Sequence, residues 1–416
     1  MFEKFVELFN RKPDYFVKSC GRFEIIGNHT DHNGGLCIAG SCNLAISGML
    51  SKRDDNLVNI VSEGYHKIAL DLNNLNIDND EKQSSESLVR GIAKYLLNNK
   101  YKVGGFDLYT RSSIFPGAGV SSSAAFELLI GQIFNELYNN NSISSFELSK
   151  AGHFAENVYF GKSCGLLDQT SIAFANVSFM DFKDDIKLET LNWNFPDIRI
   201  FLVNSGGSHA DLSHLYSNIP LKMKSAARKM GSDRLINCDS NLLDKSGLDE
   251  EEKRFAKHFY KENERVKNAK NAILSNDKKE FYKLINESFE SSRDLLRNMQ
   301  VENKYEGSPL EACDIAKSIF KNKGACKING GGFAGSIVCY VDEDIADKFR
   351  IKLCKKYSTN NVVEIKVNNE KPSVKHISIT NIWQLVIKNL IYFLIFILKN
   401  NKYDRIEHIK NGKFFR

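Results

Sequence analysis

The sequence lacks the patterns that mark several classes of protein. Its nine cysteines contain no Cys-x-x-Cys pair and no regular spacing, and an odd number of cysteines, several in apolar strand-like runs, is typical of reduced thiols in the cytosol. Residues 1–8 have no positive segment followed by an apolar core, so no secretion signal is predicted. The net charge of +6 is spread over many Lys and Glu residues, without the basic stripe of a nucleic-acid binder. We therefore expect a cytoplasmic protein that binds no nucleic acid.

The strongest positive signal is a turn rich in glycine and serine at residues 115–125, Phe-Pro-Gly-Ala-Gly-Val-Ser-Ser-Ser-Ala-Ala. A strand-like run at residues 105–110 precedes this turn. A helix follows it, with one apolar face formed by Ala125, Leu129, Ile133 and Leu137. The start of such a helix has unpaired backbone N–H groups and a partial positive charge, and together these bind anions, most often phosphate.

The residue types in this turn suit a polyphosphate. Gly117 and Gly119 have no Cβ and allow a close approach of the backbone, and the serine hydroxyls can bind phosphate or Mg²⁺. No Gly-Lys-Ser/Thr follows, so the turn is not a Walker loop. The alternative interpretation is a flexible loop followed by a helix with a serine cap.

A second signal occupies residues 21–35, Gly-Arg-Phe-Glu-Ile-Ile-Gly-Asn-His-Thr-Asp-His-Asn-Gly-Gly. An apolar strand at residues 23–26 ends at a glycine, and a dense polar turn follows. Asn and Asp favour turns for local reasons, and the two histidines around Asp31 suggest a metal but lack a convincing further ligand. A ligand rich in hydroxyl groups, such as a sugar, suits the carboxylate, imidazole and amide groups best.

Two segments later in the chain carry candidate acidic residues. Ser144 with Glu147 three residues on is the pattern of a capping box, and it predicts a helix that continues to about Phe160 and contains Glu156. Asp168 lies among small and apolar neighbours. It is interpreted either as a helix cap or as a catalytic residue.

The remaining segments predict the frame around these signals. Residues 324–336 hold a cluster of glycines before a strand at residues 337–341, which indicates either a tight hairpin or a close approach of the backbone to a ligand or to another loop. Other expected elements are antiparallel strands at 44–83, helices at 87–97 and around Tyr216, a strand at 198–203, and a charged helical hairpin with a solvated surface at 248–296.

Taken in chain order, these segments resemble the GHMP kinases, the superfamily of galactokinase, homoserine kinase, mevalonate kinase and phosphomevalonate kinase. Residues 21–32 are similar to the galactokinase signature Gly-Arg-x-Asn-Leu-Ile-Gly-Glu-His-Thr-Asp-Tyr. Residues 117–124 resemble the phosphate loop Gly-x-Gly-Leu-Ser-Ser-Ser-Ala, residues 164–169 resemble Cys-Gly-Ile-Met-Asp-Gln, and residues 330–335 resemble Gly-Gly-Gly-Phe-Gly-Gly. The resemblance extends from about residue 15 to about residue 375, and four motifs in the same order make it specific.

The resemblance implies an α+β, two-domain GHMP kinase fold with the site in the cleft between the domains. Residues 1–200 would form a ribosomal protein S5 domain 2-like N-terminal domain with the sugar signature and the phosphate loop. Residues 201–375 would form a ferredoxin-like C-terminal domain, and residues 376–416 an apolar and basic extension. The implied activity is that of a monomeric, cytoplasmic galactokinase that phosphorylates D-galactose to galactose 1-phosphate with ATP and Mg²⁺ in the Leloir pathway.

The resemblance also implies a role for each residue of the motifs. Asp168 would be the base that accepts the proton of the anomeric hydroxyl, and Arg22 beside it would keep it ionised. The sugar hydroxyls would contact Asn28, His29, Asp31, Tyr216 and the backbone at Gly165. The triphosphate would lie in the loop Gly117, Ala118, Gly119, Val120, Ser121, Ser122 and Ser123. Mg²⁺ would be held by Ser122, Ser123 and Glu156.

Several positions depart from the galactokinase pattern. Asn28 replaces Glu, His32 replaces Tyr and Glu24 replaces Asn. Since Asn28 is neutral, a kinase for galacturonate or another hexose stays open. No aromatic residue lies near Ser85 and Leu88, where many galactokinases place aromatics near adenine, so the choice between ATP and GTP is open. A sensor that binds galactose and ATP without turnover is the alternative from another class, but the intact serine loop and catalytic motif favour an enzyme.

The C-terminal tail lies outside the resemblance. Residues 382–398 form a mostly apolar run of 17 residues, interrupted by Lys388 and Asn389 and followed by a basic segment. A spanning helix needs roughly 20 apolar residues. The tail is therefore interpreted as a helix packed on the protein, as an interfacial membrane anchor, or as an extension without function.

Overall fold

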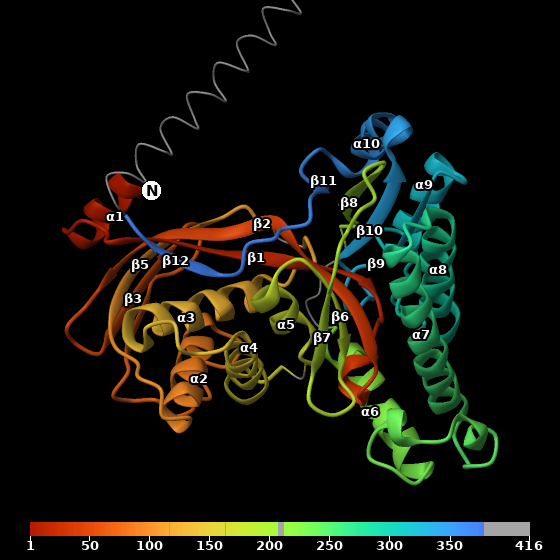
Figure 1. Ribbon diagram of the computed structural model, residues 1–416, viewed down its shortest axis with the longest axis horizontal. Coiled ribbons are helices and arrows are strands. Elements are labelled where there is room, and N and C mark those ends of the chain that lie inside the picture. Colours follow the sequence, from red (N-terminus) through yellow and green to blue (C-terminus); the bar gives the residue numbers. More distant parts are fainter. Residues whose placement is uncertain (116, 163, 207–211, 378–416) are drawn as a thin grey trace, which may run out of the picture.

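The computed structural model describes residues 1–115, 117–162, 164–206 and 212–377. The strands of this part of the chain form two sheets, and helices cover them (Figure 1). In the same described residues, no helix combines the length and the apolar content that a bilayer span requires. Residues 378–416, and with them the three interpretations of the tail, lie outside the described residues.

The first sheet contains eight strands within the described residues. They are β1 (Tyr15–Ile26), β2 (Leu36–Lys52), β3 (Leu57–Ser62), β4 (Ile68–Asp71), β5 (Phe106–Ser112), β6 (Val177–Asp181), β7 (Lys187–Leu191) and β12 (Ser373–His376). The order is β12-β1-β2-β5-β3-β4, and β6 pairs with both β2 and β7. β3 and β4 pair antiparallel, as predicted, whereas β3 and β5 run parallel. The sheet is therefore mixed.

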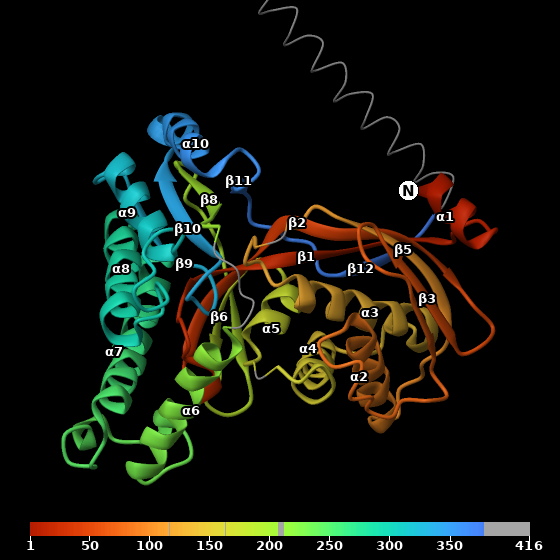
Figure 2. The ribbon, with the colours of Figure 1, turned by 180° about the vertical axis from the view of Figure 1, so that it is seen from behind.

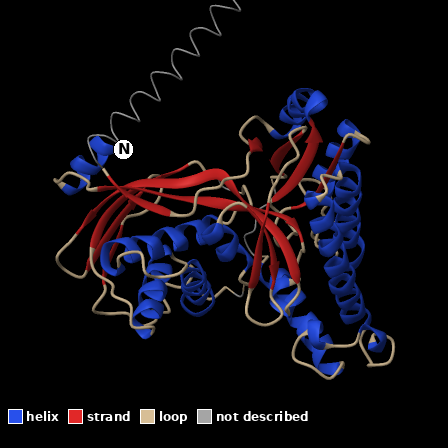
Figure 3. Ribbon diagram, viewed as in Figure 1, coloured by secondary structure: helices blue, strands red, loops and turns tan. Residues whose placement is uncertain are grey.

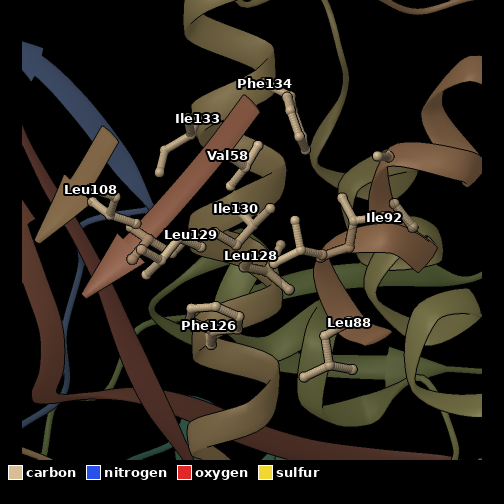
Figure 4. Packing of buried hydrophobic residues seen from close by; sticks show 14 of the residues in the cluster. Val58, Leu88, Ile92, Leu108, Phe126, Leu128, Leu129, Ile130, Ile133 and Phe134 are labelled. Carbon is tan, nitrogen blue, oxygen red and sulfur yellow. The ribbon is translucent and has the colours of Figure 1, made fainter. Parts of the chain in front are cut away.

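Helices cover one face of this sheet, as Figure 3 shows by colour. They are α2 (Ser85–Asn98), α3 (Ser122–Asn139), α4 (Ser145–Phe154) with its π-helical continuation η2 (Ala155–Phe160), and α5 (Leu167–Phe174). The apolar face predicted for α3 is buried. In Figure 4 its Leu129 and Ile133 lie near Val58 and Leu108 of the sheet, and Leu88 belongs to α2. Each such side chain stabilises the fold by about 1.5–3 kcal/mol when fully buried.

The second sheet has four strands within the described residues, in the order β11-β8-β10-β9. They are β8 (Ile198–Asn204), β9 (Gly324–Ile328), β10 (Ser336–Asp342) and β11 (Val362–Ile365). Side chains alternate between two cores. On one face Phe201 packs with Phe349 of α10 (Glu343–Tyr357) and Phe320 of α9 (Pro309–Phe320). On the other face Ile200 joins a cluster that contains Phe23 of β1, so this core connects the two sheets.

The charged hairpin of the sequence consists of α7 (Glu250–Leu274) and α8 (Lys278–Ser291), followed by η5 (Ser292–Leu296). α7 has the solvated surface that was expected, with Lys257 and Lys261 exposed, and it buries Phe255, Phe259 and Val266. The remaining helical elements are α1 (Phe2–Phe9), η1 (Asp31–Asn33), α6 (Ser213–Lys229), η3 (Leu235–Asn237) and η4 (Ser240–Leu242).

The capping box predicted at Ser144 is half formed. The Ser144 side chain accepts a hydrogen bond from the backbone N–H of Glu147. The Glu147 carboxylate, however, accepts from Lys150 and from the Tyr95 hydroxyl. Because these partners compete for the carboxylate, the reciprocal bond is missing. A complete box forms instead at Asp249, before α7.

The third glycine segment forms a hairpin, and its backbone also closely approaches another loop. β9 and β10 pair antiparallel, and the loop between them reaches the glycine and serine turn. Asn329 Nδ2 donates to the carbonyl of Gly119 at 2.9 Å, and Ser336 Oγ donates to the carbonyl of Ala118 at 2.8 Å. The start of α3, α5 and β9 therefore lie where the two sheets meet, as the two opposite views agree (Figures 1 and 2). β12 returns to pair with β1, and the predicted domain boundaries stay a prediction.

Candidate active site

Arg22 and Asp168 form the centre of the site. Arg22 lies on β1 and Asp168 in the first turn of α5. Arg22 donates from Nε to Oδ1 of Asp168 at 2.6 Å and from Nη2 to Oδ2 at 2.8 Å. This two-bond, charge-assisted contact fixes the orientation of the carboxylate. The Arg22 side chain is 7% exposed and that of Asp168 is 25% exposed, so the carboxylate stays accessible while its partner is buried.

The surroundings keep Asp168 ionised. Burial by itself would raise the pKa of its carboxyl group, but the charge and hydrogen bonds of Arg22, together with a hydrogen bond from Ser121, lower that pKa below its ordinary value. An ionised carboxylate with an open face can accept a proton from a hydroxyl group placed against it.

The glycine and serine turn presents the start of α3 next to this pair. Gly117 and Gly119 have φ angles of +77° and +68°, which favour glycine. The carbonyl of Gly119 accepts from Nη1 of Arg22 at 2.5 Å. The side chain of Ser121, at the N-cap position, forms no capping hydrogen bond with α3, so it leaves the first N–H groups of the helix unused. Such a helix start can bind an anion.

Ser123 and Glu156 lie together on the neighbouring elements. Ser123 Oγ donates to Oε1 of Glu156 at 3.2 Å, and Lys162 Nζ donates to the same oxygen at 2.8 Å. Glu156 is 2% exposed and belongs to η2, a π-helical turn of the kind often found at functional sites. A hydroxyl and a carboxylate are oxygen ligands of the kind that Mg²⁺ prefers. The Glu156 carboxylate already accepts one cation, the ammonium group of Lys162. Ser123 and Glu156 therefore fit Mg²⁺.

A buried amide connects the Glu156 position to Asp168. Gln169, the next residue after Asp168, donates from Nε2 to Glu156 Oε2 at 2.8 Å and to Glu127 Oε2 at 2.9 Å. Glu127 is 1% exposed. Burial, and then the charge of Glu156, raise the pKa of Glu127 well above its ordinary value. The sequence interpretation missed both residues, although a glutamate inside the apolar run of α3 was a signal of a buried polar contact.

The polar turn after β1 contributes Asp31. The segment before α5 approaches it so closely that an added Cβ at Gly165 would lie 1.7 Å from Asp31 Oδ2. Leu167 N–H donates to this oxygen at 3.4 Å. Burial, and then the negative charge of Asp168, raise the pKa of Asp31 to about 6. The two neighbouring carboxylates thus have pKa values that are shifted in opposite directions.

Two other predicted sugar contacts bind the third glycine loop. His29 Nε2 lies 2.9 Å from the carbonyl of Gly331, and the Tyr216 hydroxyl donates to the carbonyl of Gly332 at 2.5 Å. An added Cβ at Gly331 would lie 2.8 Å from the Tyr216 ring. The loop therefore packs directly against the side chains expected to meet the sugar.

The side chain of Asn28 also contacts the third glycine loop, but it is buried. It is 1% exposed, and its Nδ2 donates to the carbonyl of Gly330 at 2.8 Å and to the Glu24 carboxylate at 3.2 Å. Its Oδ1 accepts from Asn298 Nδ2 at 2.9 Å. The amide is thus occupied by protein groups on both sides, and a direct sugar contact by Asn28 stays a prediction.

The structure thus brings Arg22, Asp168, Asp31, Gly165 and the turn at residues 117–123 into one place. Glu156 is hydrogen-bonded to Gln169, the neighbour of Asp168. His29 and Tyr216 are hydrogen-bonded to the third glycine loop. Sequence reasoning did not find Asn298, Asn329 or Lys327, since single residues of these types carry no motif.

Comparisons with known proteins show what this chain is similar to. Residues 87–176 match the model of the GHMP kinases N terminal domain, and residues 3–52 match the galactokinase galactose-binding signature. The chain is 28% identical to the galactokinase of Clostridium tetani over 370 residues, which cover 86% of this chain and 91% of that protein. It is 29% identical to the galactokinase of Lactococcus lactis subsp. cremoris over 368 residues, with 83% and 88% covered.

Solved structures show the same fold. The crystal structure of Lactococcus lactis galactokinase complexed with galactose aligns with a TM-score of 0.79 and 26% identity, covering 89% of this chain and 98% of that one. Mevalonate kinase of Methanococcus jannaschii shares the fold, with a TM-score of 0.60 and 16% identity over 86% of this chain and 100% of that one.

The fold and the site together define a phosphotransferase of the GHMP type, a superfamily of kinases that generally use ATP and Mg²⁺. Within that superfamily, the chain belongs to the galactokinase family.

Proposed function

We propose that the protein is a sugar 1-kinase that transfers a phosphoryl group from ATP to the anomeric hydroxyl of D-galactose. The observation that carries this proposal is the Asp168 carboxylate, held in two hydrogen bonds by Arg22 beside the uncapped start of α3. Phosphoryl transfer depends mainly on positioning and charge stabilisation, with a base directed at the acceptor hydroxyl. A carboxylate next to an anion site supplies both.

In this proposal each residue has a defined task. Asp168 accepts the proton of the anomeric hydroxyl, and Arg22 keeps Asp168 ionised and offsets negative charge on the transferred group. The sugar lies between Asp31, His29, Tyr216 and the backbone at Gly165. This role of Asp31 requires its ionised form, in which the carboxylate accepts hydrogen bonds from sugar hydroxyls.

The backbone from Gly117 to Ser123 receives the triphosphate. Ser122, Ser123 and Glu156 would hold Mg²⁺, which when bound neutralises charge on the phosphates. Lys162, which donates to Glu156, would have to release this carboxylate to Mg²⁺. Its side chain is 56% exposed, so it has solvent to move into.

The sugar is tested by ADP release from the full-length protein with Mg-ATP and galactose, galacturonate, glucose, N-acetylgalactosamine or fucose. Turnover with galactose alone supports the proposal, since the Asn28 amide is then a tolerated variation. Turnover with galacturonate instead would assign the kinase to an acidic sugar. Binding of galactose without any turnover would make the protein a sensor.

The base is tested separately with Asp168→Asn. The amide keeps the shape but cannot accept a proton, so we expect loss of most turnover and nearly unchanged ATP binding. Turnover within a few-fold of the wild type would show that another group acts as the base.

A further inference from the structure

Ser121 has an unusual backbone for the residue that precedes a helix. Its φ and ψ angles are 55° and 67°, in the left-handed region, which costs a residue other than glycine about 1–2 kcal/mol. A serine before a helix normally adopts an extended backbone, and its hydroxyl accepts a hydrogen bond from the first turn. At Ser121 no such capping bond forms. Strain of this kind persists only where the surroundings hold it, and it is concentrated at active sites.

The Ser121 hydroxyl donates instead to Oδ2 of Asp168. Nη2 of Arg22 donates to the same oxygen at 2.8 Å, whereas Oδ1 accepts a hydrogen bond only from Nε of Arg22 within the described part of the chain. A carboxylate oxygen has two lone pairs in its plane. Oδ2 is therefore saturated, and the remaining acceptor position of Asp168 is on Oδ1.

On the basis of the proposed function, we infer that Ser121 is a positioning residue of the phosphoryl transfer. Its hydroxyl fixes the rotation of the Asp168 carboxylate and leaves Oδ1 as the atom that receives the proton of the acceptor hydroxyl. The left-handed backbone of Ser121 turns the hydroxyl toward α5 and away from the start of α3. The phosphates then meet Ser122, which is exposed, Ser123 and the backbone N–H groups, but not the Ser121 hydroxyl.

Other charged groups near Asp168 stay in place when Ser121 is changed. Arg22 and Lys162 favour its ionised form. The negative charges of Asp31 and Glu127 interact unfavourably with that of Asp168. Because Arg22 keeps both of its hydrogen bonds, loss of the Ser121 hydroxyl removes one donor without leaving a buried carboxylate unpaired. The fold should therefore tolerate the change.

Two variants separate the hydroxyl from the backbone. Ser121→Ala removes the hydroxyl and keeps a Cβ in the strained backbone, whereas Ser121→Gly removes the hydroxyl and relieves the strain. We expect both to lower kcat by about tenfold, the effect of losing one hydrogen bond to a charged group, with unchanged KM values for ATP and sugar. Ser122→Ala is the matched comparison, and it should raise the KM for ATP.

Two kinetic results would overturn the inference. A rise in the KM for ATP with unchanged kcat would place the Ser121 hydroxyl on the phosphates. Unchanged kcat and KM in both variants would leave it without a role. A fall in kcat in Ser121→Ala that Ser121→Gly restores would assign the effect to the backbone and would equally reject a role for the hydroxyl.

A measurement without turnover distinguishes this inference from the proposed function. The titration of Asp168 is followed by ¹³C NMR of aspartate-labelled protein, with Asp168→Asn to assign the signal. Ser121→Ala should move the midpoint up by about one pH unit, since a donor to the ionised form is lost. If the wild type turns over no sugar but the midpoint moves, the proposed function fails and the positioning of Asp168 stands. An unmoved midpoint refutes the positioning.

Discussion

Replacing Lys327 by Met should destabilise the protein strongly, although the change makes its core more apolar. Lys327 Nζ lies 2.7 Å from Oε1 of Glu24, and the two side chains are 0% and 3% exposed. Lys327 also donates to the carbonyl of Ile328 at 2.8 Å. The pair joins β1, which carries Arg22, to β9, which leads into the third glycine loop.

The magnitude follows from the burial of both charges. Unit charges 2.7 Å apart attract each other by about 6 kcal/mol at an effective dielectric constant of 20. Desolvation costs several kcal/mol per ion, so the intact pair contributes little net stability. Removing one partner leaves the other buried and uncompensated, at a cost of about 3–5 kcal/mol. Lys327→Met should therefore lose about this much, while the double variant with Glu24→Gln should lose clearly less, because the Gln amide is neutral and can still accept from Asn28.

The assay is equilibrium unfolding in urea, followed by circular dichroism, for the wild type, both single variants and the double variant. The double-mutant cycle gives the coupling energy of the pair, for which we expect at least about 2 kcal/mol. Lys356→Met is the matched control. Lys356 Nζ lies 2.9 Å from Glu311 Oε1, but its side chain is 46% exposed, so its loss should lower the stability far less than the loss of Lys327, because solvent screens an exposed ion pair.

The reasoning is refuted by either of two outcomes. One is a Lys327→Met variant that unfolds at the same urea concentration as the control. The other is a double variant whose loss equals the sum of the single losses, since additivity means that the two charges do not compensate each other.

The remaining predictions concern the site. The pKa of Asp31 is raised to about 6, so the contribution of this one carboxyl group to the stability of the ligand-free protein is greatest below about pH 4, where the group is protonated in both states, and is lost as the pH rises through about 6. Asp31→Asn should thus raise the melting temperature above pH 6 and weaken sugar binding; equal melting temperatures at pH 8 would count against the shift. Gly119→Ala should lower stability and raise the KM for ATP, because the new Cβ would lie 2.2 Å from Ser336 Oγ, and adding Ser336→Ala should restore part of both. Glu127→Leu should raise the Mg²⁺ concentration for half-maximal activity by about tenfold, through loss of the support for Gln169, whereas Glu127→Gln, which can still accept from Gln169, should have little effect; equal effects would exclude this support.

The elements next to the motifs could be predicted from the sequence. The apolar face of α3, the strand before the glycine and serine turn, and the hairpin after Gly324 all follow from local patterns, and each is present. Side-chain competition could not be predicted. The spacing of Ser144 and Glu147 predicts a capping box, but in the structure Lys150 and Tyr95 donate to the Glu147 carboxylate.

The sequence by itself determined where a helix starts after a turn rich in glycine and serine, where a strand ends at a glycine, and which residues belong to the motifs. These features depend on backbone preferences and on side chains a few positions apart. No local pattern shows that Arg22 meets Asp168, 146 positions along the chain, and only the resemblance implied this contact. The tertiary structure alone decided that Glu24 meets Lys327 and that Ser121 turns toward Asp168. These contacts depend on how two sheets and their helices pack, because the cost of burying a charge is offset only by a partner that packing brings within hydrogen-bond distance.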